Sequence, residues 1–164
     1  MLFFYKPLGK LELAIADFDR AIELDPEYAR AYYDRGSAYD ARGEMARAIA
    51  EYERAQELDP GMADNNSALC LSHALNLRAH EAMPSCNKAI AADSNPYFYD
   101  TRGLVYAQLG DYDAAIQDLQ HFVDALSEQD DPELAAMIEQ RQGWIKMLQK
   151  SVNPFTPAVL ENWR

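Results

Sequence analysis

The chain has 164 residues, the length of one domain, and 49% of them are apolar, enough to form a hydrophobic core. Asp and Glu number 27 against 15 Lys and Arg, which gives a formal net charge of −12. Phosphate binding needs a basic patch, so this balance argues against nucleic acid and against an anionic membrane surface as partners.

The N-terminal residues, MLFFYKPLGK, are apolar but lack the charged leader and small-residue cleavage site of a secretory signal. No apolar run approaches the ~20 residues that cross a bilayer. Two cysteines, Cys70 and Cys86, are too few for a disulfide framework. We therefore expect a cytoplasmic protein.

A repeat runs through most of the chain. Alanines recur at a spacing of 34 in two columns, Ala14, Ala48 and Ala82 in one and Ala21, Ala55 and Ala89 in the other. A further copy follows at a spacing of 33, where Cys70, His73, Leu77 and Ala82 are matched by Gly103, Tyr106, Gly110 and Ala115. The spacing predicts a partial copy at residues 1–28 and three copies at 29–62, 63–95 and 96–128.

The clearest copy, residues 29–62, predicts two helices joined by a short turn. Apolar residues recur at helical spacing on both sides of Gly43, which can adopt the left-handed conformation that ends a helix. Pro60 stops the second helix because proline lacks the backbone donor. Gly36 and Ala48 are small, which allows the two helix axes to approach closely.

This unit resembles the tetratricopeptide repeat. The family's order of aromatic, small, glycine, alanine and proline positions is met by Tyr32, Gly36, Tyr39, Gly43, Ala48, Tyr52, Ala55 and Pro60. Arg35 departs from the pattern, because this column is usually Leu. The resemblance covers roughly residues 1–128 and implies an all-α fold, a right-handed α-solenoid of stacked antiparallel hairpins.

The other copies are less regular. Residues 1–28 contain only the end of a first helix (Leu2 to Leu8) and then a complete second helix. Pro84, in the degenerate third copy, is compatible with its helix only if that helix starts late and has Pro84 in its first turn.

Beyond the repeats, residues 132–150 predict a capping helix, with Asp131 as its N-cap before Pro132. A solenoid needs such a cap to cover its last hairpin. We therefore assign residues 1–151 to the repeat domain and 152–164 to a proline-containing tail. Thr156 and Pro157 can start a short helix at 157–163, and the tail's apolar residues suggest that it docks on something: Phe155, Val159, Leu160 and Trp163.

Cys70, His73 and Cys86 form the one cluster with ligand chemistry. Both cysteines lie at the same distance from a predicted turn near residue 78, so they can face each other within the third hairpin. His80 is the nearest fourth ligand, but the spacing matches no zinc signature and we predict no metal site. We expect both thiols to pack as small buried groups. A disulfide or redox pair, and a metal site, remain as alternatives.

The sequence predicts no enzyme and no cofactor. It has no phosphate-binding glycine loop, no nucleophile elbow and no HExxH string. Its glycines lie mostly in repeat columns or turns.

The resemblance implies a binding surface instead. In the family, the first helix of each hairpin lines a concave groove for a partner's peptide or helix. The matching positions here are Arg30, Tyr33, Ser37 and Asp40, then Asp64, Ser67, Leu71 and Leu75, then Tyr97, Asp100, Leu104 and Gln108. Apolar members would supply contact area, and the aspartates favour a neutral or basic partner with apolar anchors.

The same comparison argues against one ligand class. Family members that bind the acidic C-termini of chaperones use Lys, Asn and Arg as a carboxylate clamp in these columns. The corresponding positions here are Tyr33, Ser37, Asp64, Ala68 and Asp100. We therefore predict no binding of chaperone tails.

The sequence thus predicts a non-enzymatic interaction module or scaffold. One alternative is a homodimer through the incomplete N-terminal hairpin, where Phe4 and Phe18 would contribute to the interface. The other is a metal- or redox-responsive protein that uses Cys70 and Cys86.

Overall fold

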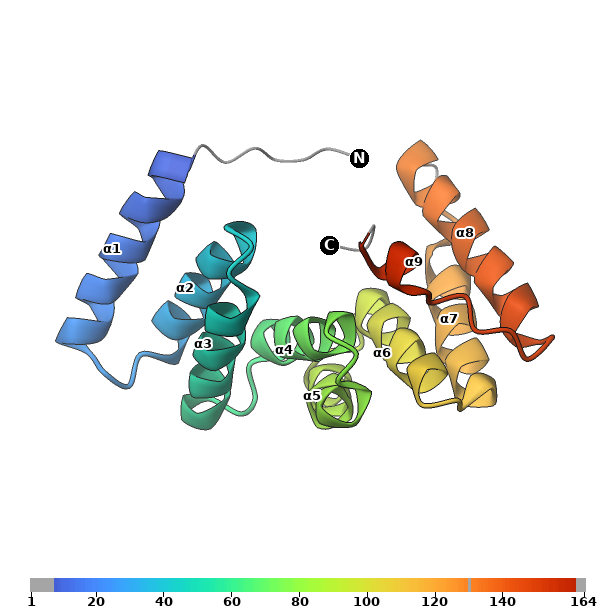
Figure 1. Cartoon of the computed structure of the whole chain (residues 1–164), viewed down its shortest axis with the longest axis horizontal. Coiled ribbons are helices and arrows are strands. Elements are labelled where there is room, and N and C mark those ends of the chain that lie inside the picture. Colours follow the sequence, from blue (N-terminus) through green and yellow to red (C-terminus); the bar gives the residue numbers. More distant parts are fainter. Residues whose placement is uncertain (1–7, 130, 162–164) are drawn as a thin grey trace. The chain divides into compact units, whose positions relative to one another are not determined.

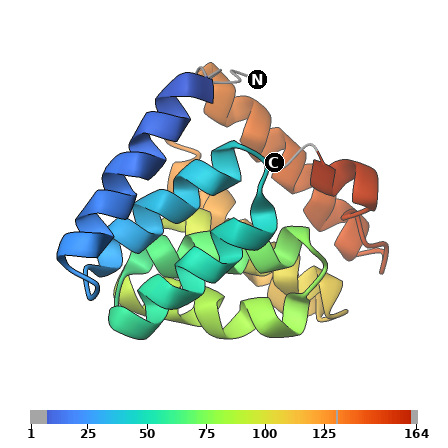
Figure 2. The same ribbon diagram turned by 60° about the vertical axis from the view of Figure 1, so that its left-hand side comes forward.

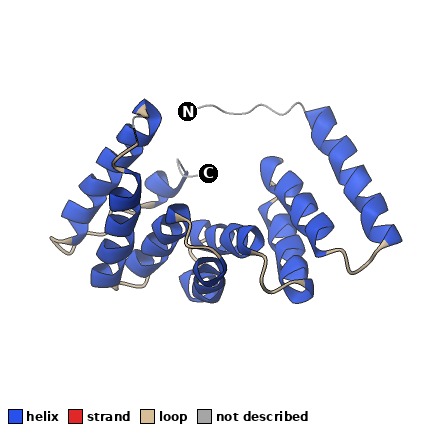
Figure 3. Ribbon diagram, turned by 180° about the vertical axis from the view of Figure 1, so that it is seen from behind, coloured by secondary structure: helices blue, strands red, loops and turns tan. Residues whose placement is uncertain are grey.

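The computed structural model describes residues 8–129 and 131–161, and every regular element in that part of the chain is a helix (Figure 1, Figure 3). The helices are α1 (Leu8–Leu24), α2 (Ala29–Ala41), α3 (Met45–Leu58), α4 (Ala63–Leu75), α5 (Ala79–Ala92), α6 (Pro96–Gln108), α7 (Tyr112–Leu126), α8 (Pro132–Leu148) and α9 (Pro157–Glu161). The chain divides within α4 into two compact units, one ending at Asn66 and the other beginning at Ser67.

The first unit is built on the α2–α3 hairpin, with α1 packed on α2 (Figure 2). Gly43 has the predicted left-handed conformation, with a φ of 78°, and the Glu44 N–H donates to the Tyr39 carbonyl at 2.9 Å. Leu11 and Ile15 of α1 are buried together with Ala38 of α2. Ala14, Phe18 and Ile22 of the same helix are partly buried.

The predicted end of a helix before Gly9 is wrong. Gly9 lies inside α1, which begins at Leu8, so Gly9 forms no turn. The residues after it, Lys-Leu-Glu-Leu, favour helix and the backbone at Gly9 stays helical. The rest of the predicted Leu2–Leu8 helix, and Phe4 with it, lies outside the described residues.

A hydrophobic core of the second unit includes residues of α4 to α8 and of the segment after α8. α6 pairs with α7, and α8 packs on α7 at the position predicted for a capping helix. The Asp131 side chain accepts hydrogen bonds from the N–H groups of Glu133 (2.8 Å) and Leu134 (3.4 Å), as the sequence predicted for an N-cap. Gly110 repeats the turn of Gly43, with a φ of 82°.

The third hairpin departs from its predicted form at two positions. α5 begins at Ala79, so Pro84 lies inside the helix and not in its first turn. Pro84 is exposed, which leaves water free to replace the hydrogen bond that proline cannot donate. Leu77 takes the turn position that Gly43 and Gly110 have elsewhere, and its φ is +58°.

One contact between the two helices of a hairpin recurs in all three complete copies, between positions 16 residues apart. In two copies a glycine faces a large side chain. A Cβ on Gly36 would lie 2.7 Å from Tyr52 Cε1, and one on Gly103 would lie 3.1 Å from Leu119 Cγ. In the third hairpin the same pair of positions is Cys70 and Cys86, and a disulfide joins them.

Arg35, which departs from the repeat pattern, has a structural role. Its guanidinium donates to Asp19 of α1 at 2.6 Å and to Glu51 of α3 at 2.7 Å. Arg102, in the matching column of the second unit, binds Asp118 at 2.7 Å and Asn87 at 3.0 Å. In each case one arginine contacts its own hairpin and the helix before it, which a leucine in that column cannot do.

We predict that Gly36→Ala lowers the free energy of unfolding by about 1–3 kcal/mol, because the buried Tyr52 ring must move to admit a methyl group. Gly143→Ala is the matched control. It lies in α8 with nothing within 4 Å of an added Cβ, so alanine should stabilise the helix by about 0.5–1 kcal/mol. Urea unfolding of both variants checks this, and equal effects would contradict the close contact.

Candidate functional site

The α2 face consists of the groove positions predicted in the first unit: Arg30, Tyr33, Ser37 and Asp40 on α2, and Asp64 at the start of α4. Arg30, Asp40 and Asp64 are exposed, whereas Tyr33 and Ser37 are partly buried. All five side chains therefore reach the surface of this unit.

Tyr33 is fixed from both sides. Its ring lies 5.8 Å from the buried Tyr52 ring, and the Arg30 guanidinium lies 5.0 Å from its centre. Arg30 is in turn bound to Asp34 at 3.0 Å, and this hydrogen bond raises the pKa of Arg30. Tyr52 donates to Ser37 Oγ at 3.4 Å, and burial raises the pKa of Tyr52 to about 12, so it stays protonated. A partly buried aromatic ring is thus held in one orientation at the surface of this unit.

A cavity of about 200 Å³ lies beside this face. Its apolar wall consists of Leu11, Ala14, Phe18 and Ala38, and its polar wall of Asp34 and Ser37. The Asp64 carboxylate lies 3.9 Å from the Arg30 guanidinium, outside the cavity. The arrangement combines a small apolar recess with several carboxylates.

The other predicted positions lie in the second unit, where fewer are accessible. Ser67 and Leu71 of α4 are partly buried, and Leu75 is buried. Tyr97 of α6 is 47% exposed and its ring lies edge-on to Phe122 at 5.4 Å. Gln108 donates from Nε2 to the Ala74 carbonyl at 2.9 Å, which links α6 to α4.

Asp100 and Leu104, predicted to face a partner, are instead buried in the second unit, at 3% and 0% exposure. Arg141 of α8 donates from Nη2 to Asp100 Oδ2 at 2.6 Å and from Nε to Oδ1 at 3.0 Å. Burial raises the pKa of the Asp100 carboxyl, and the ion pair with Arg141 offsets part of that rise. The capping helix thus takes up one of the positions that the family pattern assigns to a ligand.

The segment after α8 also binds this surface. Asn153 Nδ2 donates to the Ala107 carbonyl on α6 at 3.0 Å. The Phe155 ring packs edge-on against Trp144 of α8, with centroids 4.9 Å apart. The sequence marked Phe155 and Leu160 as docking residues, but it gave no sign of Asn153, because an asparagine before a proline is typical of an ordinary turn.

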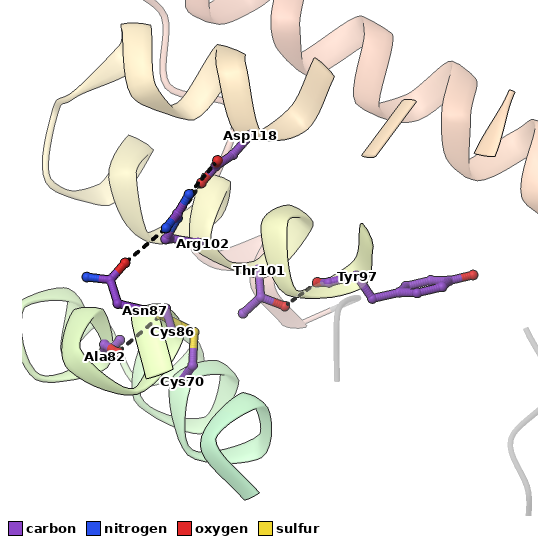
Figure 4. The surroundings of a disulfide bond; sticks show 8 residues. All are labelled: Cys70, Ala82, Cys86, Asn87, Tyr97, Thr101, Arg102 and Asp118. Carbon is purple, nitrogen blue, oxygen red and sulfur yellow. Dashed lines mark hydrogen bonds and ion pairs between the residues drawn. A yellow bond between two sulfur atoms is a disulfide. The ribbon is translucent and has the colours of Figure 1, made fainter. Parts of the chain in front are cut away.

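The cysteines form a disulfide between α4 and α5, so the expectation of two free buried thiols is wrong (Figure 4). Their predicted placement opposite each other is correct, with Cα atoms 4.9 Å apart. The Asn87–Arg102–Asp118 chain of polar contacts lies next to the disulfide in Figure 4 and leads from α5 through α6 to α7. Within the described residues, no group of three or more His, Cys, Asp or Glu side chains is placed to bind a metal ion.

Two models of the tetratricopeptide repeat match the sequence, one over residues 8–63 and the other over residues 97–125. The chain belongs to the tetratricopeptide repeat family. This confirms the predicted fold class, an α-solenoid of helical hairpins. A search among curated proteins finds none that matches this tetratricopeptide repeat chain.

Solved tetratricopeptide structures share the fold. TTC0263, a TPR protein of Thermus thermophilus, is 18% identical with a TM-score of 0.65, over 82% of this chain and 74% of its own. The second TPR domain of human RPAP3, in complex with an HSP70 peptide, is 24% identical with a TM-score of 0.58, over 70% of this chain and 94% of its own. The first TPR of Spaghetti (RPAP3), bound to an HSP90 peptide, is 20% identical with a TM-score of 0.61, over 73% of this chain and 94% of its own.

We predict that reducing the disulfide lowers the free energy of unfolding by about 3 kcal/mol, the value for a closed loop of ~15 residues. The loss has two origins. Reduction leaves the unfolded chain less constrained, and the two small thiol side chains fill the contact less well than glycine with Tyr52 or Leu119 does in the other hairpins. Urea unfolding with and without dithiothreitol measures the effect. A Cys70→Ser/Cys86→Ser variant is the control and should not respond to the reductant.

We predict that Asp100→Ala destabilises the chain by about 3–5 kcal/mol, because it leaves the Arg141 guanidinium buried without its carboxylate. The double variant Asp100→Leu/Arg141→Met removes both charges and should recover most of this loss. Thermal unfolding of the two variants provides the comparison. If the double variant is no more stable than Asp100→Ala, the pair does not act as a buried ion pair.

Proposed function

We propose that this tetratricopeptide repeat protein is a non-enzymatic interaction module that binds a partner polypeptide on the α2 face. The observation that carries the proposal is the oriented Tyr33 ring on the α2 face, whose Ser37 also lines the 200 Å³ cavity. Partly exposed aromatic residues in fixed positions are typical anchors of protein interfaces, because little conformational entropy is lost on binding.

The partner segment has apolar anchors and neutral or basic flanks. The cavity admits an aliphatic or aromatic side chain. Asp34 lines its polar wall, and Asp40 and Asp64 add negative charge on the α2 face outside it. The formal charge of −12 favours the approach of a basic segment in the same way.

Peptides bound to similar structures support a peptide-binding role but not the same ligand. The peptides SRMEEVD and SGPTIEEVD, bound to the RPAP3 domains, are acidic near their C-termini. In this chain Asp64, which only accepts hydrogen bonds when ionised, occupies a position where the family's carboxylate clamp has a donor. Chaperone tails are therefore excluded from the proposal.

The disulfide indicates the kind of cellular compartment in which the protein is found. Disulfides persist in oxidising compartments and are rare in the cytoplasm. The Cys70–Cys86 bond thus favours an oxidising compartment over the cytoplasmic location that the sequence predicted. Among the helices that are described, none has the length and apolar character of a membrane span.

A homodimer through α1 is a second candidate. Leu13 and Leu24 are 68% and 72% exposed on α1, and Phe18 lines the 200 Å³ cavity. Light scattering separates the two functions, since a monomeric chain that binds peptide leaves only the first.

The test selects a library of random 12-residue peptides on the whole chain and measures the selected peptides by fluorescence polarisation. We expect enrichment of Lys or Arg beside aliphatic residues, and at least tenfold weaker binding to Tyr33→Ala. Tyr28→Ala is the matched control, because Tyr28 is 48% exposed in the same unit but lies off the α2 face. SRMEEVD should not bind.

Equal loss of affinity in the Tyr33→Ala and Tyr28→Ala chains would rule out the α2 face as the binding surface. Binding of SRMEEVD at the same affinity as the selected peptides would overturn the predicted charge preference.

A further inference from the structure

The chain after α8 does not continue away from the second unit but turns back across it, and Figure 1 shows it running towards α6. The turn is made at Ser151, which has a φ of +58°, and the Val152 N–H donates to the Met147 carbonyl at 3.0 Å. We call residues 153–160 the C-terminal segment. It is non-helical up to Thr156 and then forms the first residues of α9.

The first anchor of the C-terminal segment is polar. Asn153 donates from Nδ2 to the Ala107 carbonyl near the end of α6, at 3.0 Å. Its Oδ1 accepts the Phe155 N–H at 2.9 Å, so the same side chain fixes both the docked position and the local turn. A short non-helical stretch is thus attached to α6 through a side-chain amide.

The second and third anchors are apolar. Phe155 is 6% exposed and meets the Trp144 ring edge-on. Leu160 is 4% exposed and belongs to the same core as Leu104 and Leu148. Polar attachment followed by two buried side chains is how short peptides bind to a preformed surface.

The C-terminal segment leaves part of this surface unfilled. A cavity of about 370 Å³ remains beside it, lined by Asn153 and Phe155 of the segment and by Leu77, Ala79, His80, Gln108 and Leu109. Gln108 Oε1 is buried and accepts no hydrogen bond from any residue that the structure describes. A buried acceptor without a donor costs free energy of folding. Gln108 also lines the cavity, so a bound segment could supply the donor.

We propose that this surface, formed by the end of α6, the α4–α5 turn and Trp144, is a second polypeptide-binding site with the C-terminal segment as its built-in competitor. The partner is a segment with a side-chain amide, an aromatic residue two positions later and an aliphatic residue about five positions after that. It also brings a donor for Gln108. The site lies in the second unit and does not depend on the α2 face.

The attachment of the C-terminal segment explains why such a site is closed in the free chain. A tethered ligand has an effective concentration of roughly millimolar, so a separate segment binds only if it is stronger or if the tethered one is released. The apparent affinity of a separate segment is lowered in proportion to the fraction of chains in which the site is open.

The experiment uses a fluorescein-labelled peptide with the sequence of residues 151–164 as the probe and full-length chains as receptors. Phe155→Ala weakens the tethered segment, so this chain should bind the probe at least tenfold more tightly than the unaltered chain. Val152→Ala is the matched control, since Val152 is 48% exposed beside the segment, and it should bind like the unaltered chain. Probes with Asn153→Ala or Phe155→Ala should lose binding.

Asn153→Ala serves as a second receptor in case Phe155→Ala fails to fold, because it removes one hydrogen bond and leaves the buried ring in place. A folded Asn153→Ala chain that binds the probe no better than the unaltered chain overturns the proposal. So does a dimeric unaltered chain that becomes a monomer in the Phe155→Ala variant, since the occupant is then a second copy. Tyr33→Ala should leave probe binding unchanged, which separates this site from the α2 face.

Discussion

The close contact between the two helices of each hairpin is the constraint on which the rest of the structure depends. Two hairpins meet it with a glycine against Tyr52 or Leu119, and the third meets it with the Cys70–Cys86 bond. At the same two positions of the repeat, a covalent bond in the third hairpin therefore replaces the packing of a large side chain against glycine in the other two. The helix spacing set by this contact allows one arginine, Arg35 or Arg102, to reach carboxylate or amide partners on both sides.

Much of the fold could be predicted from the sequence, because it depends on local signals that repeat. The turns at Gly43 and Gly110 and the N-cap Asp131 are specified by the residues that form them. The predictions failed at Gly9 and Pro84, where the local signal is ambiguous. A glycine can end a helix or lie within one, and an exposed proline is tolerated where water reaches the carbonyl left without its bond.

The candidate site was less predictable, because it depends on contacts between distant parts of the chain. Tyr33 and its neighbours on the α2 face reach the surface as the family pattern implies. Asp100 and Leu104 occupy the same columns but are covered, because Arg141 and the C-terminal segment lie over α6. Sequence periodicity identifies which face of a helix points inward, but it does not reveal which later segment of the chain will cover that face.

Leu77 shows how backbone strain and binding can oppose each other at one residue. Its left-handed conformation costs roughly 1–2 kcal/mol relative to the glycine found at this turn in two other hairpins. The same backbone carries an apolar side chain that is 62% exposed and lines the 370 Å³ cavity. A glycine in its place would relax the turn and remove an apolar wall from that cavity. A chain thermostabilised by Leu77→Gly would therefore offer less apolar contact area to a segment bound at the proposed second site.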